Sequence, residues 1–447
     1  MKKILSLLFA VIILASSLCL LSYGVGQAYM GVTTAKTPIN NVSLLFSKKF
    51  GGNYKAAPTP PVVVGDTVLL VSGVKLYKLN AETGEEIASV KMEGSTLYTT
   101  VSPLYADGKI FVSLDEGIVQ AFDYKTMKSL WVYTDKIGGQ ALCPITYDNG
   151  YIYSGFWVDE TEYANYVCLN TEDKNVNEEY ETKNAVWTYK ALGGFYWAGC
   201  CVTDKYVIFG KDDGKKNSES SSKIISLDKS TGKAVSSLKV TGDIRSSVVY
   251  SAETDAYYFS SKAGHIYKFS MDSSGKLGSL KTYTAPGAAT ATPVVYNGRL
   301  YVGCQNGSAG KFIVLDAKTM KEIYTADMQG YPQASMLIAT GYEQTSGKIY
   351  IYSTCNAKPG GITVFEDSQG QTTAVKTELF TPSEDMQQYC ISTISVGSDG
   401  TLYYKNDSGN IFAIGEKEPE VRLNFFQKII EAIKNIIAKI ITLFNKK

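Results

Sequence analysis

Residues 107–131 have the sequence DGKIFVSLDEGIVQAFDYKTMKSLW, which combines short apolar strands with three polar turns. The pair Asp107–Gly108 tolerates positive φ and closes a two-residue hairpin before the strand core Ile110–Val112. A second strand, Ile118–Phe122, ends at the turn Asp123–Met127, whose aspartate can accept backbone N–H bonds. This stretch therefore predicts a small antiparallel unit of short strands.

The same unit recurs about every 50 residues, which is a period typical of repeat folds. Eight strand cores share the pattern: Val68–Val71, Ile110–Val112, Ile152–Tyr153, Val207–Phe209, Tyr257–Phe259, Leu300–Val302, Ile349–Ile351 and Leu402–Tyr404. The turn of residues 123–127 returns as Asn80–Gly84, Asp228–Gly232 and Asp316–Met320. An apolar residue four positions after the turn threonine is predicted to begin the outermost strand: Ile87, Leu130, Val235 and Ile323.

One such unit buries little by itself, whereas a ring of them covers their faces and leaves only short edges. We predict an all-β, eight-bladed β-propeller of four-stranded antiparallel blades over residues 40–415. Seven blades are the alternative, because the last two repeats are irregular, and a two-domain β-sandwich would not explain a turn repeated in register. The eighth repeat ends near Ile414 without an outer strand, so Val42–Phe46 is predicted to complete it and close the ring.

The unit at residues 107–131 resembles the pyrroloquinoline-quinone (PQQ) repeat, which has a glycine-led strand, a second strand ending in A-[LF]-[DN], then x-x-T-G and a tryptophan. The resemblance covers most of residues 60–415, although only Trp131 and the more loosely placed Trp187 supply the tryptophan, and Tyr324 replaces it in the sixth repeat. It implies a propeller fold and leaves function open. Quinone-dependent alcohol and glucose dehydrogenases carry this repeat, and so do cofactor-free scaffolds such as the propeller lipoprotein of outer-membrane protein assembly.

The dehydrogenases of this family hold calcium with Glu, Asn and Asp near the quinone, use an Asp base and an Arg, and often stack a vicinal disulfide on the ring. Cys200 and Cys201 are adjacent in this chain, and Arg245 lies on a later inter-blade segment. No matching Glu, Asn and Asp set occurs at the motif positions. We therefore predict a protein without catalytic residues, metal or cofactor. A PQQ- and calcium-dependent oxidoreductase and a structural envelope-assembly protein are the alternatives.

Composition narrows the chemistry further. The chain has 44 Lys and Arg against 43 Asp and Glu, a net charge of +1, which gives no electrostatic reason to bind nucleic acid. The single histidine, His265, excludes multi-histidine metal sites and is predicted to lie at a solvent-facing turn. Residues 157–186 are predicted to form an acidic loop that elongates the third blade. Seven cysteines follow the N-terminal segment, and most are interpreted as buried structural thiols.

The segment GGFYWAGCC at Gly193–Cys201 precedes the first strand of the fourth blade. In a propeller such segments cross one face and converge near the axis, where partly exposed aromatic and polar side chains can bind a ligand. The predicted ligand-binding residues of this funnel are Tyr98, Gln140, Phe195, Tyr196, Trp197, Arg245, Gln333 and Tyr389. The alternative is that they only fill the packing between blades. We expect a protein, peptide or glycan ligand.

Both termini predict a location outside the cytoplasm. Residues 1–28 have the basic start, apolar run and small residues of a signal peptide, with an uncleaved anchor as the alternative. A charged linker at 416–422 leads to residues 423–447, predicted as a basic amphipathic helix. Its candidate membrane-contacting residues are Phe426, Ile430, Ile433, Ile437, Ile440 and Phe444. The same stripe also suits a partner helix or the propeller flank, and we expect a secreted protein retained at the bacterial cell surface.

Overall fold

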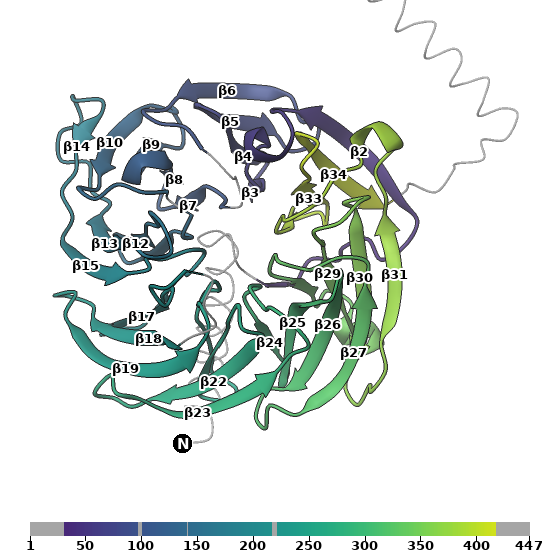
Figure 1. Cartoon of the computed structure of the whole chain (residues 1–447). Helices are drawn as coiled ribbons and strands as arrows, with labels where there is room; N and C mark the ends of the chain where they lie inside the picture. The colour runs from purple at the N-terminus through teal and green to yellow at the C-terminus, as the bar shows by residue number, and fades with distance from the viewer. Residues whose placement is uncertain (1–30, 97–100, 141, 217–220, 417–447) are drawn as a thin grey trace, which may run out of the picture.

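The computed structural model describes residues 31–96, 101–140, 142–216 and 221–416. Its strands form eight sheets arranged radially around one axis, so that the strands of each sheet follow one another from the axis to the rim (Figure 1). Within each blade the neighbouring strands are antiparallel, as in the third blade, where three successive pairs have this direction. The predicted eight-bladed propeller is confirmed, and the seven-bladed alternative is wrong.

Blades one to four follow the order of the chain. Blade one contains β3 (Val62–Val64), β4 (Thr67–Ser72), β5 (Lys75–Asn80) and β6 (Glu86–Lys91). Blade two contains β7 (Leu104–Ala106), β8 (Lys109–Ser113), β9 (Ile118–Asp123) and β10 (Ser129–Thr134). Blade three contains β11 (Thr146–Asp148), β12 (Tyr151–Gly155), β13 (Tyr163–Asn170) and β15 (Trp187–Leu192). Blade four contains β16 (Cys201–Val202), β17 (Tyr206–Gly210), β18 (Ser221–Asp228) and β19 (Ala234–Thr241).

Blades five to eight complete the ring. Blade five contains β20 (Val249–Ser251), β21 (Ala256–Ser260), β22 (His265–Met271) and β23 (Leu277–Thr284). Blade six contains β24 (Val294–Tyr296), β25 (Arg299–Asn306), β26 (Ala309–Asp316) and β27 (Glu322–Met328). Blade seven contains β28 (Leu337–Ala339), β29 (Lys348–Ser353), β30 (Ile362–Ser368) and β31 (Val375–Phe380). Blade eight contains β32 (Ser395–Val396), β33 (Leu402–Lys405), β34 (Asn410–Glu416) and β2 (Val42–Lys49).

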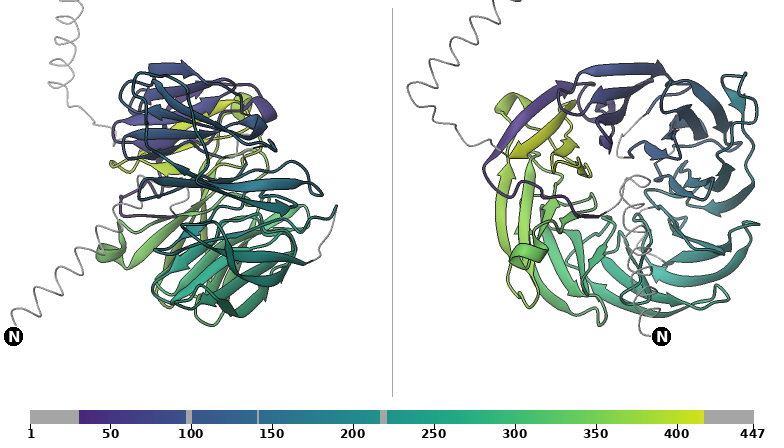
Figure 2. Two further views of the ribbon diagram at one scale, coloured as in Figure 1. Left: turned by 90° about the vertical axis from the view of Figure 1, so that its left-hand side faces the viewer. Right: turned by 180° about the vertical axis from the view of Figure 1, so that it is seen from behind.

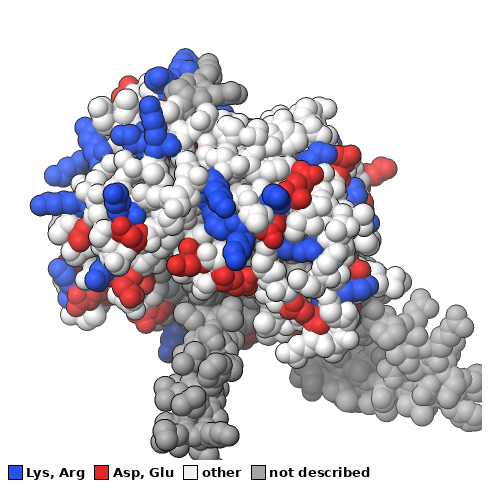
Figure 3. All heavy atoms as spheres, turned by 90° about the horizontal axis from the view of Figure 1, so that it is seen from below, with Lys and Arg blue, Asp and Glu red and all other residues white. Residues whose placement is uncertain are grey.

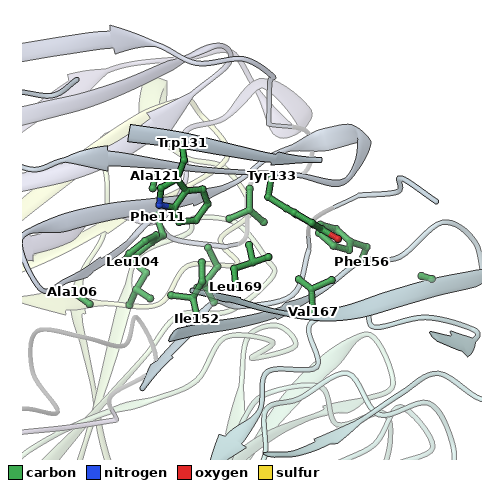
Figure 4. Close-up of a cluster of buried hydrophobic side chains, with 13 residues drawn as sticks. Leu104, Ala106, Phe111, Ala121, Trp131, Tyr133, Ile152, Phe156, Val167 and Leu169 are labelled. Carbon is green, nitrogen blue, oxygen red and sulfur yellow. The ribbon is translucent and has the colours of Figure 1, made fainter. Parts of the chain in front are cut away.

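The hydrophobic core lies between neighbouring blades. The middle strands are buried on both faces, so every residue of β4 is buried, whereas Val240 is the one buried residue of β19 on the rim. Between blades two and three, the fully buried Trp131 ring packs 5.9 Å from Phe111 in the same cluster as Leu169 (Figure 4). Burial of this kind is the main favourable term in folding, so each blade depends on its neighbours for stability.

The strand at Val42–Lys49 closes the ring as predicted. β2 pairs antiparallel with β34, with Ser43 opposite Gly415 and Ser47 opposite Phe412. This pairing covers the edge that the eighth blade would otherwise expose. Loops project from the two faces of the closed ring, as the side view shows (Figure 2).

The segment before β2 is also tied to the ring, which the sequence did not predict. β1 (Val32–Thr33) adds to the inner edge of blade seven by parallel pairing with β28. Thr37 is fully buried, and its hydroxyl lies 2.7 Å from the hydroxyl of Tyr352 in β29. The chain therefore crosses from the inner edge of blade seven to the rim of blade eight.

The predicted acidic loop at residues 157–186 is only partly correct. Tyr163–Asn170 is β13, the third strand of blade three, and most of it is buried. Of the rest, β14 (Glu181–Thr182) pairs in parallel with β10 and so belongs to the outer edge of blade two. The strand was missed because its repeated turn is replaced by a longer acidic connection.

The described residues contain one short α-helix, α2 (Glu343–Ser346), and no helix among them is long and apolar enough to cross a membrane. The predicted signal peptide at 1–28, the linker beyond Glu416 and the amphipathic helix at 423–447 lie outside the described residues. On the side of the ring seen in Figure 3, basic and acidic side chains are interspersed, in keeping with the net charge of +1.

Candidate functional site

Two adjacent cavities lie where the segments between blades converge. The larger has a volume of about 550 Å³, and the smaller, of about 30 Å³, shares Trp197, Gln333 and Ile391 with it. The larger is lined by Asn53, Tyr54, Tyr196, Trp197, Gln333, Asn356, Gln388, Tyr389, Ile391, Lys405 and Asp407. The smaller adds Arg245, Thr290, Thr292, Ala334, Ser335 and Thr393. We call the residues lining these two cavities the funnel.

The funnel brings together five residues that the sequence singled out. They come from four different inter-blade segments, which shows that these segments do converge: Tyr196, Trp197, Arg245, Gln333 and Tyr389. Tyr389 is 49% exposed, and both Tyr196 and Trp197 are partly exposed. Their rings and polar groups are thus accessible from the cavity.

Three other candidates are not part of it. Phe195 is fully buried and packs edge-on against Tyr166 and Phe209, with ring centres 5.0 and 5.4 Å apart, so it belongs to the inter-blade core. Gln140 forms an isolated β-bridge with Trp157 and lines neither cavity. Tyr98 lies outside the described residues.

Sequence reasoning missed several residues of the funnel, among them Tyr54 before blade one and Lys405 and Asp407 in blade eight. Tyr54, in the 3-10 turn η1 (Tyr54–Ala56), is 60% exposed at the cavity, and Lys405 and Asp407 flank the end of β33. Tyr54 lies on the segment entering blade one, which is equivalent to the segment of Trp197, so the same register argument could have found it. No sequence signal marks Lys405 and Asp407.

These missed residues are joined by backbone hydrogen bonds. The N–H of Tyr54 donates to the carbonyl of Asp407 at 3.1 Å, and the N–H of Asp407 donates to the carbonyl of Tyr389 at 2.9 Å. The two exposed tyrosines, which are far apart in sequence, are therefore fixed to one another through a single residue. Because the backbone at both tyrosines is already fixed, ligand binding does not have to pay for ordering these segments.

Two of the aromatic residues have unusual backbone conformations. Tyr54 has φ of 55° and Trp197 has φ of 57°, in the left-handed region that bulky residues rarely adopt. Such strain persists only where the surrounding structure imposes it, and it is concentrated at functional sites. Phe195 is buried in the inter-blade core, whereas the next two rings, Tyr196 and Trp197, both line the cavity.

An ion-pair cluster around Arg245 lies against the Tyr196 ring. The Arg245 guanidinium donates to both carboxylate oxygens of Asp212, with its terminal nitrogen 2.7 Å from Oδ2, and it also contacts Glu160 and Asp243 at 3.3 and 3.6 Å. Its central carbon lies 4.4 Å from the centre of the Tyr196 ring. The charge of Arg245 is therefore compensated within the protein and holds Tyr196 in position.

Burial raises the pKa of the Asp212 carboxylate in this cluster. Asp212 is 1% exposed, and desolvation raises its pKa to about 7, opposed by Arg245 and reinforced by the neighbouring Asp243. Burial raises the pKa of Asp243 as well, and Arg245 opposes the shift at both carboxylates.

The funnel does not fit the calcium-bound quinone suggested by the PQQ resemblance. Asp407 is the acidic residue of the lining, and its carboxylate is paired with Lys405 at 3.0 Å. In the described part of the chain, no group of three or more His, Cys, Asp and Glu side chains is arranged to hold a metal ion. Cys200 and Cys201 are both free thiols there, and burial raises the pKa of Cys200 to about 11.

Comparison with known proteins finds similarity to one repeat family over part of the chain. The model of the family described as outer membrane protein assembly factor BamB matches residues 45–149. No curated protein matches the chain. Three solved structures with 13–14% identity share the fold, as their TM-scores of 0.55 to 0.62 indicate.

BamB from Moraxella catarrhalis is 14% identical, has a TM-score of 0.55, and the alignment covers 84% of this chain and 99% of that one. Quinohemoprotein alcohol dehydrogenase from Comamonas testosteroni is also 14% identical, with a TM-score of 0.62 and coverage of 87% and 79%. A europium-containing methanol dehydrogenase is 13% identical, with a TM-score of 0.61 and coverage of 85% and 89%. The eight closed blades are thus the fold of these proteins, and the match over residues 45–149 shows that this part of the chain is similar to the PQQ-like repeat family.

Proposed function

We propose that this protein is a non-enzymatic binding scaffold that holds a protein, peptide or glycan ligand in its funnel. The observation that carries the proposal is the set of accessible rings, Tyr54, Trp197 and Tyr389, around a cavity of about 550 Å³. That volume is in the range of small-ligand sites. Two of the three rings, Tyr54 and Trp197, are carried by residues with positive φ.

The proposed site is tested by substituting its rings. Trp197→Ala combined with Tyr389→Ala removes two of them, and Tyr389 is half exposed, so the second change costs little packing. Captured material from the native cell surface is compared between wild type and the double variant, with melting temperature as the control for folding. We expect the double variant to fold and to lose the partner. Full retention of the partner would contradict the proposed site.

The absence of enzymatic activity is part of the proposal. The Asp407–Lys405 pair, which compensates the acidic side chain of the lining, argues against a calcium-bound quinone in the funnel. Adding PQQ and calcium to the purified protein and following dye-linked oxidation of alcohols and sugars is a direct check. Turnover above that of the buffer control would favour an oxidoreductase function, since dehydrogenases are among the structural neighbours.

We further propose that the protein acts outside the cytoplasm and is retained at the cell surface. The signal-like residues 1–28 support export, and the match to a family named for outer-membrane assembly supports an envelope location. The basic apolar stripe at 423–447 would supply the retention. Deleting 423–447 should leave the propeller folded and release it from cells and from anionic liposomes. Unchanged partitioning would exclude this segment as the anchor.

A further inference from the structure

We infer that the funnel ligand is a neutral oligosaccharide, bound by stacking on Tyr54, Trp197 and Tyr389 and by hydrogen bonds to the surrounding side-chain amides. This inference rests on the proposed binding function and names the chemical class of its ligand. Four independent features of the funnel lead to it.

The first feature is the arrangement of the rings. Tyr54 and Tyr389 are 60% and 49% exposed, and Trp197 is partly exposed on a third segment. The C–H face of a pyranose is apolar and weakly positive, so it packs on the negative face of an aromatic ring. Several rings on separate rigid segments suit a ligand made of repeated flat units.

The second feature is the amide side chains between the rings. The larger cavity is lined by four of them: Asn53, Gln333, Asn356 and Gln388. Each amide both donates and accepts, as does each sugar hydroxyl, so the two groups match without a charge. The Nδ2 of Asn356 donates to the Oε1 of Gln333 at 2.7 Å, and this bond orients both amides. The pair can then offer a ligand a donor on Gln333 and an acceptor on Asn356.

The third feature is the balance of charge. Lys405 and Asp407 are 2% and 8% exposed and pair with each other at 3.0 Å, while Arg245 is compensated by Asp212 at 2.7 Å. A charged ligand would have to break one of these pairs or be desolvated without a partner, and both are costly. The funnel therefore favours an uncharged ligand.

The fourth feature disfavours a peptide strand. Peptides that bind to sheets add to an exposed strand edge. The innermost strands here have only two or three residues, as β16 and β20 do, and the inner edge of β28 already pairs with β1. The described inner edges thus offer no continuous ladder for an extended peptide backbone.

Isothermal titration calorimetry of the full mature chain tests the inference. The probes are maltohexaose, cellohexaose, mannohexaose and xylohexaose, with hexagalacturonate as the charged counterpart. We expect at least one neutral hexamer to bind with a Kd below about 1 mM. We also expect this Kd to change less than about twofold when NaCl rises from about 0.05 M to about 0.5 M, because no ionic contact is made.

Tyr54→Gly is the decisive variant. The φ of 55° suits glycine, so the change removes the ring while relieving the backbone, and the melting temperature should be unchanged or higher. Affinity for the neutral hexamer should fall at least about tenfold. Tyr180→Gly is the matched control, because Tyr180 has φ of 69° and is 39% exposed but lies outside the funnel. That variant should bind like wild type.

The outcomes separate this inference from the proposed function. If no neutral hexamer binds, or if hexagalacturonate binds more tightly, the inference is overturned. If in that case the Trp197→Ala and Tyr389→Ala double variant still loses its cell-surface partner, the binding function stands with a ligand of another class. If neither the hexamers nor the partner depend on these rings, both proposals fail.

Discussion

The indole N–H of Trp187 donates to the main-chain carbonyl of Lys229 at 2.8 Å, which anchors the repeated turn of blade four on the outer strand of blade three. The next residues of that turn are fixed locally, because Asp228 Oδ1 accepts from the N–H groups of Ser230 and Thr231 at 3.1 and 2.9 Å. Gly232 then adopts φ of 68° against the indole. The turn motif is thus an inter-blade contact as well as a hairpin.

Gly232→Ala should measure the strength of this contact. A Cβ there would lie 2.6 Å from the indole of Trp187, in addition to the unfavourable φ. We expect the free energy of unfolding to fall by about 2–4 kcal/mol in urea titrations, the sum of overpacking and backbone strain. Gly298→Ala is the matched control, since its φ is 73° but no heavy atom lies within 4 Å of the added Cβ. Equal losses of unfolding free energy in both variants would show that the close packing of Gly232 against Trp187 adds nothing to the cost of the substitution.

Phe46→Ala tests the closure of the ring. The Phe46 ring in β2 packs 6.3 Å from Tyr403 of β33 and against Gly84 in the turn of blade one, so it joins the last blade to the first. Because the ring is half-buried, we expect a loss of about 1–3 kcal/mol in unfolding free energy. Leu45→Ala, at a neighbouring side chain that is 49% exposed, should cost only about 0.5 kcal/mol. Similar values for the two would contradict a role of Phe46 in closure.

The fold could be predicted from the sequence because it is specified locally and repeatedly. Each turn such as Asp228–Gly232 encodes its own geometry, and the alternating strands encode burial, so the number of blades follows from the number of repeats. Even the closing strand could be identified, since the eighth repeat lacked one. β13 was missed because it is followed by an acidic connection instead of the repeated turn.

The site could be predicted only in part because it depends on long-range placement. The convergence of Trp197, Arg245 and Gln333 follows from propeller topology. Phe195 was misplaced because its side chain packs into the inter-blade core, and a single sequence does not show which side of this segment faces the cavity. Lys405 and Asp407 were missed because their pairing at the end of β33 has no sequence signature.

Asp212→Asn should change how stability depends on pH. The pKa of Asp212 is raised to about 7, above its value in the unfolded chain, so its proton stabilises the native state below about pH 4 and this contribution is lost as pH rises through about 7. Relative to the variant, wild type should therefore lose about 1–3 kcal/mol of unfolding free energy between about pH 5 and about pH 8. Urea titrations across this range measure the difference.

Asp228→Asn is the control for the pH experiment. Hydrogen bonds from Ser230 and Thr231 lower the pKa of Asp228 in the native state. Its contribution to stability is therefore present above the pKa of the unfolded chain and is lost only as pH falls through the lowered pKa. Between about pH 5 and about pH 8, the unfolding free energy of this variant should change with pH in the same way as that of wild type. Parallel curves for Asp212→Asn as well would mean that the Asp212 carboxylate stays ionised beside Arg245 throughout.

Arg245→Lys tests whether the ion-pair cluster positions the aromatic rings of the funnel. Lysine keeps the positive charge but lacks the planar fork that donates to Asp212 at two nitrogens and stacks 4.4 Å from the centre of the Tyr196 ring. The partly buried pair should lose about 1–3 kcal/mol in unfolding free energy. Near-ultraviolet circular dichroism should weaken as well, because the Tyr196 and Trp197 rings, 4.9 Å apart, lose their fixed orientation. A stability loss with an unchanged aromatic spectrum would show that Arg245 stabilises the blades without holding the rings, since packing against Trp157 at 5.1 Å would then suffice to fix Tyr196.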